Sequence, residues 1–155
     1  MEFDREAIVA SFLSETEEGL SLVEQSLLAM ESNPSDPELL PNIFRVAHSL
    51  KGNATSLGFE ELAGFAHVVE DLLDVLRQQQ AVPGPELISM LLKAVDELRV
   101  MVPAFAKGSS ELTNGQQELR KQIVRQVQKR SKRIVTAATV SMETSAASKA
   151  DALSS

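Results

Sequence analysis

Residues 60–77 read EELAGFAHVVEDLLDVLR, and this stretch sets the expected fold. Its apolar residues recur every three or four positions, which is the period of an α-helix with one buried face. They are Leu62, Phe65, Ala66, Val69, Leu72, Leu73 and Leu76. The polar residues His67, Glu70, Asp71 and Asp74 are also three or four positions apart, so they lie on another face. The stretch predicts an amphipathic helix with a buried side and a polar side.

Three more segments have the same period, at about residues 4–30, 37–56 and 86–102. Clusters rich in proline, glycine or serine separate them, at 32–37 (SNPSDP), 57–59 (LGF) and 82–85 (VPGP). No segment alternates as a strand would, and the 4% aromatic content favours helix over sheet. Four amphipathic helices with short connections predict an all-α fold, an antiparallel up-down-up-down four-helix bundle over residues 1–105.

Local signals indicate where these helices begin and end. The helix at 37–56 begins either with Asp36 as N-cap and Pro37 at the first helical position, or with a capping box of Ser35 and Glu38. Gly58 is placed as a left-handed residue after the end of that helix. The last helix of the bundle is expected to open at Pro85 and to end before Pro103.

The chain changes character after residue 105. Residues 1–105 carry 18 acidic and 6 basic side chains, a net charge of −12, whereas residues 106–155 carry 9 basic and 4 acidic ones, a net charge of +5. A linker and a basic fifth helix are predicted over 106–134, the helix at about 115–134 with Thr113 and Gln116 as its capping box. Its apolar stripe is thin, so we expect weak packing against the bundle or none. Residues 135–155, rich in Ala, Ser and Thr, are predicted to be a disordered linker.

The composition excludes several classes of protein. The chain has 155 residues and no cysteine, which rules out disulfides, cysteine-based zinc fingers, iron–sulfur clusters and thiol catalysis. No apolar run approaches the length of a membrane span, and the acidic start does not resemble a secretory signal. We therefore expect a cytoplasmic protein without membrane insertion. The basic residues at 120–133 would allow contact with nucleic acid, but we interpret them as a solvated helix face and expect no nucleic-acid partner.

One group of residues favours phosphoryl chemistry. His48, Lys51 and Gly52 are spaced i, i+3 and i+4, so they share one helix face, offset from the apolar stripe. An exposed imidazole beside a lysine suits nucleophilic attack on a phosphoryl group, whose charge Lys51 would offset. Glu70 on the next helix could accept the hydrogen of one ring nitrogen and make the other nitrogen more basic.

The residues around His48 resemble a known motif. Residues 44–59, FRVAHSLKGNATSLGF, are similar to the phosphorylation motif F-R-x-A-H-S-x-K-G-x-A-x-x-x-G-F of histidine phosphotransfer domains, in particular the N-terminal domain of CheA-type chemotaxis histidine kinases. Residues 67–74, HVVEDLLD, resemble the segment H-x-x-E-x-L-L-D of that family. The resemblance covers residues 3–105 and extends weakly to 134.

The resemblance implies a role for each site residue. His48 would be the phosphoacceptor through Nε2, with Glu70 accepting the hydrogen of Nδ1 and orienting the ring. Lys51 would assist phosphoryl transfer by offsetting the negative charge of the phosphoryl group. His67 would support the Glu70–His48 network. Ser49, Gly52 and Asn53 would contact protein partners, although the family often has a second glycine where this chain has Asn53.

The resemblance also implies partners and cofactors. The phosphoryl group would come from the ATP-binding catalytic domain of the same parent protein and pass to an aspartate of CheY-like and CheB-like response regulators. ATP and Mg²⁺ would belong to the catalytic domain and Mg²⁺ to the regulator, so no cofactor or metal is expected on this chain. No nucleotide-binding motif follows residue 134, so the chain alone is expected not to be an enzyme, whereas the parent would be a protein-histidine kinase. As an isolated domain we expect a monomer.

Two alternatives remain open. The chain could be a non-catalytic interaction or scaffold bundle whose histidines are structural. It could also be a di-metal carboxylate bundle, but that class needs Glu-x-x-His on two helices, and the order here is His67-x-x-Glu70, found once.

Overall fold

A computed structural model describes residues 2–132 of the chain as helices joined by short connections. The helices are α1 (Glu2–Ser32), α2 (Leu39–Ser56), α3 (Glu60–Gln78) and α4 (Pro85–Ala106), followed by a fifth helix over residues 114–132. No strand occurs within 2–132, so the predicted all-α fold is confirmed. The predicted linker at 135–155 lies outside the described residues, as does the expected end of the fifth helix at 133–134.

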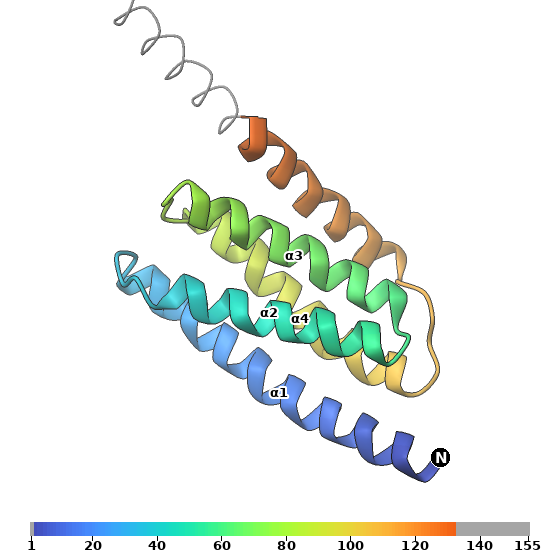
Figure 1. Ribbon diagram of the computed structural model, residues 1–155. Helices are drawn as coiled ribbons and strands as arrows, with labels where there is room; N and C mark the ends of the chain where they lie inside the picture. Colours follow the sequence, from blue (N-terminus) through green and yellow to red (C-terminus); the bar gives the residue numbers. More distant parts are fainter. Residues whose placement is uncertain (1, 133–155) are drawn as a thin grey trace, which may run out of the picture.

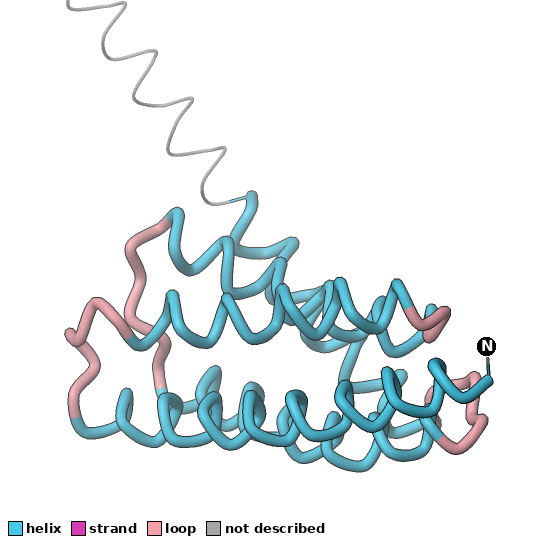
Figure 2. The backbone as a smooth tube through the Cα atoms, turned by 60° about the horizontal axis from the view of Figure 1, so that its bottom comes forward, coloured by secondary structure: helices cyan, strands magenta, loops and turns pink. Residues whose placement is uncertain are grey.

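The first four helices form the predicted antiparallel bundle (Figure 1). Each helix packs against two neighbours, in the order α1–α2–α3–α4 and back to α1, and the diagonal pairs do not approach each other. The connections lie at the two ends of the bundle (Figure 2). No helix within residues 2–132 combines the length and the apolar character needed to cross a membrane.

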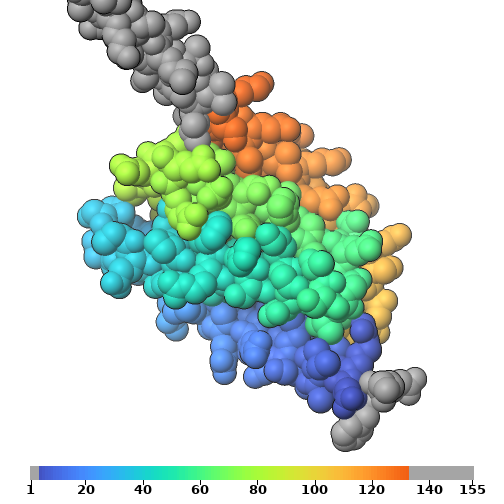
Figure 3. All heavy atoms as spheres, viewed as in Figure 1, coloured from blue at the N-terminus to red at the C-terminus, as the bar shows by residue number. Residues whose placement is uncertain are grey.

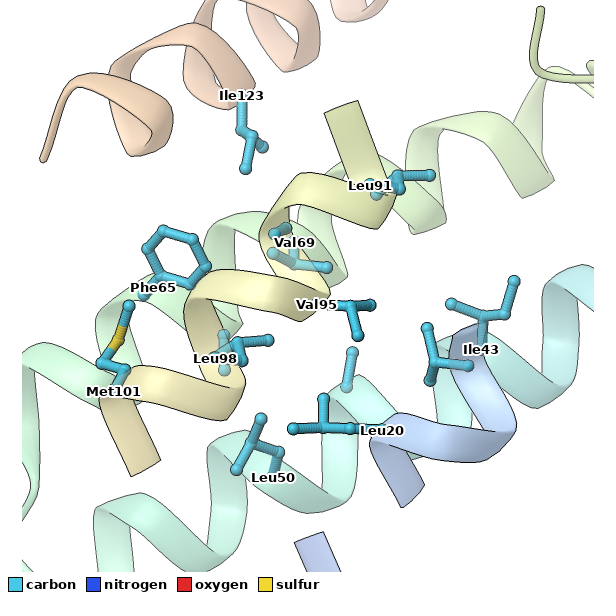
Figure 4. Close-up of a cluster of buried hydrophobic side chains, with 14 of the residues drawn as sticks. Leu20, Ile43, Leu50, Phe65, Val69, Leu91, Val95, Leu98, Met101 and Ile123 are labelled. Atoms are coloured by element: carbon cyan, nitrogen blue, oxygen red, sulfur yellow. The ribbon is translucent and has the colours of Figure 1, made fainter. Parts of the chain in front are cut away.

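A continuous apolar core fills the space between the helices. Every helix contributes side chains to it, and Figure 4 shows a part of this cluster, with Leu20, Ile43, Phe65 and Val95 pointing inward from four different helices. Leu27, Leu62, Leu72, Leu73 and Leu76 are completely buried. Burying a leucine side chain stabilises the fold by roughly 1.5–3 kcal/mol, so this core supplies a rigid support for residues at the surface.

The start of α2 differs from both predicted alternatives. The helix begins at Leu39, with Glu38 as N-cap and no side-chain cap. Asp36 instead accepts a hydrogen bond through Oδ1 from the backbone N–H of Glu38, at 3.0 Å. The Asp36 carboxylate, which the sequence predicted to cap the helix, thus accepts its hydrogen bond within a local turn. The helix begins two residues later than Pro37.

The end of α4 also corrects a prediction. The helix continues to Ala106 and contains Pro103, which was expected to lie just beyond it. Pro103 is exposed, whereas Phe105 is only 3% exposed. A proline in a helix forfeits one backbone hydrogen bond. Continuing the helix places Phe105 in the core, and this burial offsets the lost bond.

The fifth helix packs more firmly than its sequence indicates. Its predicted capping box is present: Thr113 N–H donates to Gln116 Oε1 at 2.9 Å, and Gln116 N–H donates to Thr113 Oγ1 at 3.2 Å. Leu112, Leu119 and Ile123 are at most 5% exposed and belong to the same core as the bundle. Arg120 pairs with Glu61 of α3 at 3.1 Å, which helps to hold the helix along α3. The expectation of weak packing is therefore wrong.

The turn between α2 and α3 sets the register of the two helices that carry the site. Gly58 has a φ of +80°, as predicted for a left-handed residue after the end of α2. Its N–H donates to Thr55 O, and the N–H of Phe59 donates to Ala54 O at 2.9 Å, which is the Schellman pattern. Arg5 of α1 donates through Nη2 to the carbonyl of Leu57 at 3.0 Å and ties the turn to the bundle. The turn is thereby held in one geometry.

Candidate functional site

His48 lies on the outer face of α2, and its ring extends toward α3. Its side chain is 62% exposed, as the offset from the apolar stripe predicted. Nδ1 is 2.9 Å from Oε1 of Glu70, so one hydrogen bond crosses from α2 to α3. Figure 3 shows α2 and α3 together on the viewed face of the molecule, with the fifth helix beyond α3 and away from α2. The described part of the chain therefore leaves this face open.

Glu70 lies at the centre of the group and is the least exposed of its members. Its side chain is 12% exposed, and Oε2 lies 2.7 Å from Nζ of Lys51. The Lys51 ammonium and this oxygen form an ion pair. One carboxylate thus holds both His48 and Lys51, one through each oxygen.

The surroundings of Glu70 keep it ionised. Burial is the largest single influence and would by itself raise the pKa of Glu70. The contacts of its oxygens with Lys51 and His48, and the nearby positive charge, act in the opposite direction and together prevail, so the pKa lies below its usual value. At neutral pH the group is a carboxylate that can only accept hydrogen bonds.

The protonation state of Glu70 determines which nitrogen of His48 is reactive. Since the carboxylate accepts, Nδ1 must carry the hydrogen that lies between the two groups. The neutral imidazole then has its lone pair on Nε2. A carboxylate partner also fixes the ring orientation. The geometry therefore produces a nucleophilic nitrogen on an exposed side chain.

His67 occupies a different environment from the one predicted. Its Nε2 lies 3.3 Å from Oδ2 of Asp71, one turn further along α3, and both side chains are largely exposed. Within residues 2–132 no hydrogen bond or ion pair joins His67 to Glu70 or to His48. The structure therefore brings together three of the four predicted site residues, and the supporting role of His67 stays a prediction.

The predicted partner-contact residues line the surface next to His48. Ser49, Gly52 and Asn53 are all exposed on α2. A Cβ atom added to Gly52 would meet nothing within 4 Å, so packing within the described chain does not require glycine there. Asn53 lines a groove of about 470 Å³ between α1 and the end of α2. Its apolar lining includes the exposed Ile8 and the buried Phe12.

Two residues beside His48 were given no role by the sequence analysis, although Phe44 is the first fixed position of the motif. The ring of Phe44 stacks on the His48 ring, with centroids 6.1 Å apart and planes inclined by 13°. The guanidinium carbon of Arg77 lies 4.0 Å from the centre of the Phe44 ring. The spacing i, i+4 of Phe44 and His48 could have indicated the first contact. Nothing in the sequence indicates the second, because it joins two helices.

The described residues also bear on the di-metal alternative. No group of three or more His, Asp or Glu side chains within 2–132 is arranged to hold a metal ion. The carboxylate that such a site would need, Glu70, is engaged with Lys51 and His48 instead.

Comparisons with known proteins identify similar chains and a family. The chemotaxis protein CheA of Treponema pallidum is 35% identical over 103 residues, which are 66% of this chain and 13% of that protein. The phosphorylated P1 domain of CheA3 from R. sphaeroides, solved in complex with CheY6, is 27% identical with a TM-score of 0.73, over 79% of this chain and 97% of that chain. The CheA phosphotransferase domain of Thermotoga maritima is 34% identical with a TM-score of 0.58, over 63% of this chain and 92% of that one.

These similarities concern one part of larger proteins, since this chain spans between 13% and 16% of the curated CheA relatives. The family model described as Hpt domain matches residues 7–101, which contain His48, Lys51 and Glu70. The match covers most of the bundle and the whole of the His48 site. The chain belongs to the Hpt family of histidine phosphotransfer domains, and its similarity is to those of CheA chemotaxis proteins.

Proposed function

We propose that His48 is the phosphoacceptor of this domain and that Nε2 is the nucleophile. The hydrogen bond between Nδ1 and Glu70, with the ring 62% exposed, is the observation that carries the proposal. In the first step the Nε2 lone pair attacks the γ-phosphorus of ATP held by a kinase catalytic domain. The bond from that phosphorus to the bridging oxygen breaks, and ADP leaves. The ring becomes a phosphorylated imidazolium, whose positive charge the Glu70 carboxylate stabilises.

In the second step the phosphoryl group leaves His48. An aspartate oxygen of a response regulator attacks the phosphorus, the N–P bond breaks, and its electron pair returns to Nε2. Such transfers pass through a loose transition state, so positioning and charge stabilisation supply most of the catalysis. Lys51 lies one turn from His48 and contributes positive charge, and Mg²⁺ comes with the regulator and the ATP-binding domain. No metal or cofactor on this chain takes part.

The proposed partners follow from the relatives. One similar structure is a P1 domain in complex with CheY6, which supports a CheY-like regulator for this chain. A CheB-like regulator and the catalytic domain of the same parent protein-histidine kinase complete the proposal. The exposed residues Ser49, Gly52 and Asn53 give these partners a surface beside the reacting nitrogen. In this role the domain acts in the cytoplasm as a monomer, and without the ATP-binding domain it does not phosphorylate itself.

A phosphorylation assay tests the proposal. The chain is mixed with ATP, Mg²⁺ and the separated catalytic core of its parent kinase, and intact mass is recorded for wild type and for His48→Gln. We expect one phosphoryl group that is acid-labile and alkali-stable in wild type and absent from the variant. A folded wild-type chain that gains no phosphoryl group would contradict the proposal and favour the scaffold alternative.

A further inference from the structure

The His48 ring has a second restraint that the proposed phosphotransfer does not use. One hydrogen bond, Nδ1 to Glu70, fixes the position of one ring atom but leaves the ring free to tilt about that contact. The terminal torsion of histidine has a broad energy minimum, and a side chain that is 62% exposed has few packing contacts to narrow it. The direction of the Nε2 lone pair therefore depends on whatever else holds the plane of the ring.

Phe44 supplies that plane. It precedes His48 by one helical turn on α2, and the two rings are inclined by only 13° with centroids 6.1 Å apart. This separation lies within the range of favourable offset stacking. Phe44 is partly buried and packs against the core. Its ring is therefore restrained by the core as well as by the contact with His48.

Arg77 of α3 in turn holds Phe44. Its guanidinium carbon lies 4.0 Å from the centre of the Phe44 ring, which is a cation–π contact between the two helices that form the site. Asp74 accepts a hydrogen bond from Arg77 Nη2 at 3.1 Å and another from Gln78 Nε2 at 3.2 Å. These contacts orient the Arg77 head group on its own helix.

We propose that Phe44 and Arg77 are positioning residues for phosphoryl transfer, which set the plane of the His48 ring and so the direction of the Nε2 lone pair. The inference rests on the proposed function of His48. Glu70 determines which nitrogen is reactive, and the pair of Phe44 and Arg77 determines where that nitrogen points. Such alignment matters because a small displacement of a reacting atom from the attack geometry can lower a rate by about 100-fold.

The kinetic test uses Phe44→Leu and Arg77→Gln in the assay with ATP, Mg²⁺ and the catalytic core. We expect Phe44→Leu to lower the phosphorylation rate at saturating catalytic core by about tenfold, with KM for the core unchanged. Arg77→Gln should lower it by about threefold, and Phe44→Tyr, which keeps the ring, should retain the wild-type rate. Equal rates in wild type, Phe44→Leu and Arg77→Gln would overturn the inference, as would an effect confined to KM.

Matched controls separate positioning from loss of stability or charge. Phe59→Leu removes a partly buried ring that packs on Phe12 and Phe105 instead of on His48, and it should leave the rate unchanged. Arg125→Gln removes an exposed arginine from the fifth helix and should also have no effect. Circular dichroism and melting temperatures establish that each variant is folded. If Phe44→Leu fails to fold, Arg77→Gln decides.

An NMR measurement on the free domain tests whether the rings of Phe44 and His48 stack, and it does not depend on phosphorylation. The ring current of Phe44 should move the His48 ring-proton signals upfield in wild type, and Phe44→Leu should abolish that shift. Unshifted signals in wild type would overturn the stacking even if His48 is phosphorylated. A wild-type chain with shifted signals but no phosphorylation would instead contradict the proposed function.

Discussion

The two histidines of the bundle each contact a carboxylate, yet their surroundings differ. His48 contacts a carboxylate on another helix, Glu70, which is 12% exposed and also paired with Lys51. His67 contacts Asp71 one turn away on its own helix, where the carboxylate is 44% exposed. Nδ1 of His48 lies 2.9 Å from its carboxylate, and Nε2 has no polar partner among residues 2–132, whereas in His67 it is Nε2 that lies 3.3 Å from the carboxylate.

The difference shows what a carboxylate needs in order to activate a histidine. An exposed pair within one helix gains little, since water screens the charges and both side chains lose freedom. A carboxylate that is paired with a lysine and largely buried stays in one position. It therefore fixes one tautomer of its histidine partner. The same two functional groups therefore give a partly buried contact between two helices in one region and an exposed pair within one helix in the other.

The largest expected effect separates the two histidines directly. His48→Gln should abolish phosphoryl acceptance, because glutamine has no nucleophilic nitrogen, and its helical circular-dichroism signal should equal that of wild type. His67→Gln should retain the rate within about twofold, as expected for an exposed pair. Intact mass after incubation with the catalytic core, ATP and Mg²⁺ measures both. A tenfold loss in His67→Gln would restore the predicted supporting role of His67.

Removing each carboxylate in turn tests its importance to its histidine. Glu70→Ala should slow phosphorylation at least about tenfold without unfolding the bundle, because it removes the group that fixes the tautomer. Asp71→Ala is the matched control on the same helix and should change the rate less than about twofold. Rates come from single-turnover kinetics, and ¹⁵N NMR of the His48 ring reports the tautomer. An unchanged rate and tautomer in Glu70→Ala would show that the activating partner is another group.

Removing the lysine should have a smaller effect. Lys51→Met should slow phosphorylation about fivefold, since the site loses positive charge but keeps the hydrogen bond from Nδ1. It should also raise the pKa of Glu70, because burial then faces less opposition. Lys93→Met, at an exposed position of α4, is the control for charge. A Glu70 titration by ¹³C NMR that is identical in wild type and Lys51→Met would contradict the ion pair.

The smallest expected effect is on stability. Because the pKa of Glu70 in the folded chain lies below the ordinary value of 4.5, its ionised form stabilises the fold above that pH. The contribution is lost as the pH falls through the lower, folded-state value. The difference in unfolding free energy between wild type and Glu70→Gln should therefore shrink on acidification through this range. Urea titrations at several pH values measure it, and a difference that stays constant would contradict the lowered pKa.

Features that depend on neighbouring residues were predicted from the sequence. The apolar period gave the four helices, and the capping box of Thr113 and Gln116 and the left-handed Gly58 appear in the structure. Each depends on residues within one or two turns, so the sequence contains the whole signal. The contact between His48 and Glu70 also followed, because the motif specified both helices.

Features that depend on tertiary packing were predicted less well. The thin stripe of the fifth helix gave no sign that Leu119 and Ile123 would be almost completely buried, since their burial depends on how this helix packs on the core of the bundle. The burial of Phe105 likewise carried α4 past Pro103. The contact of Arg77 with Phe44 depends on how two helices face each other, which periodicity within one helix does not specify.

The turn around Gly58 has a consequence for how the site forms during folding. The site residues, from Phe44 to Arg77, lie on a single helical hairpin, so bringing them together requires closure of one short loop. Contacts of such small sequence separation form quickly. We therefore expect the contact of His48 with Glu70 to form with this hairpin, before the fifth helix completes the core. The hairpin of α2 and α3 thus contains by itself the residues that contact the His48 ring.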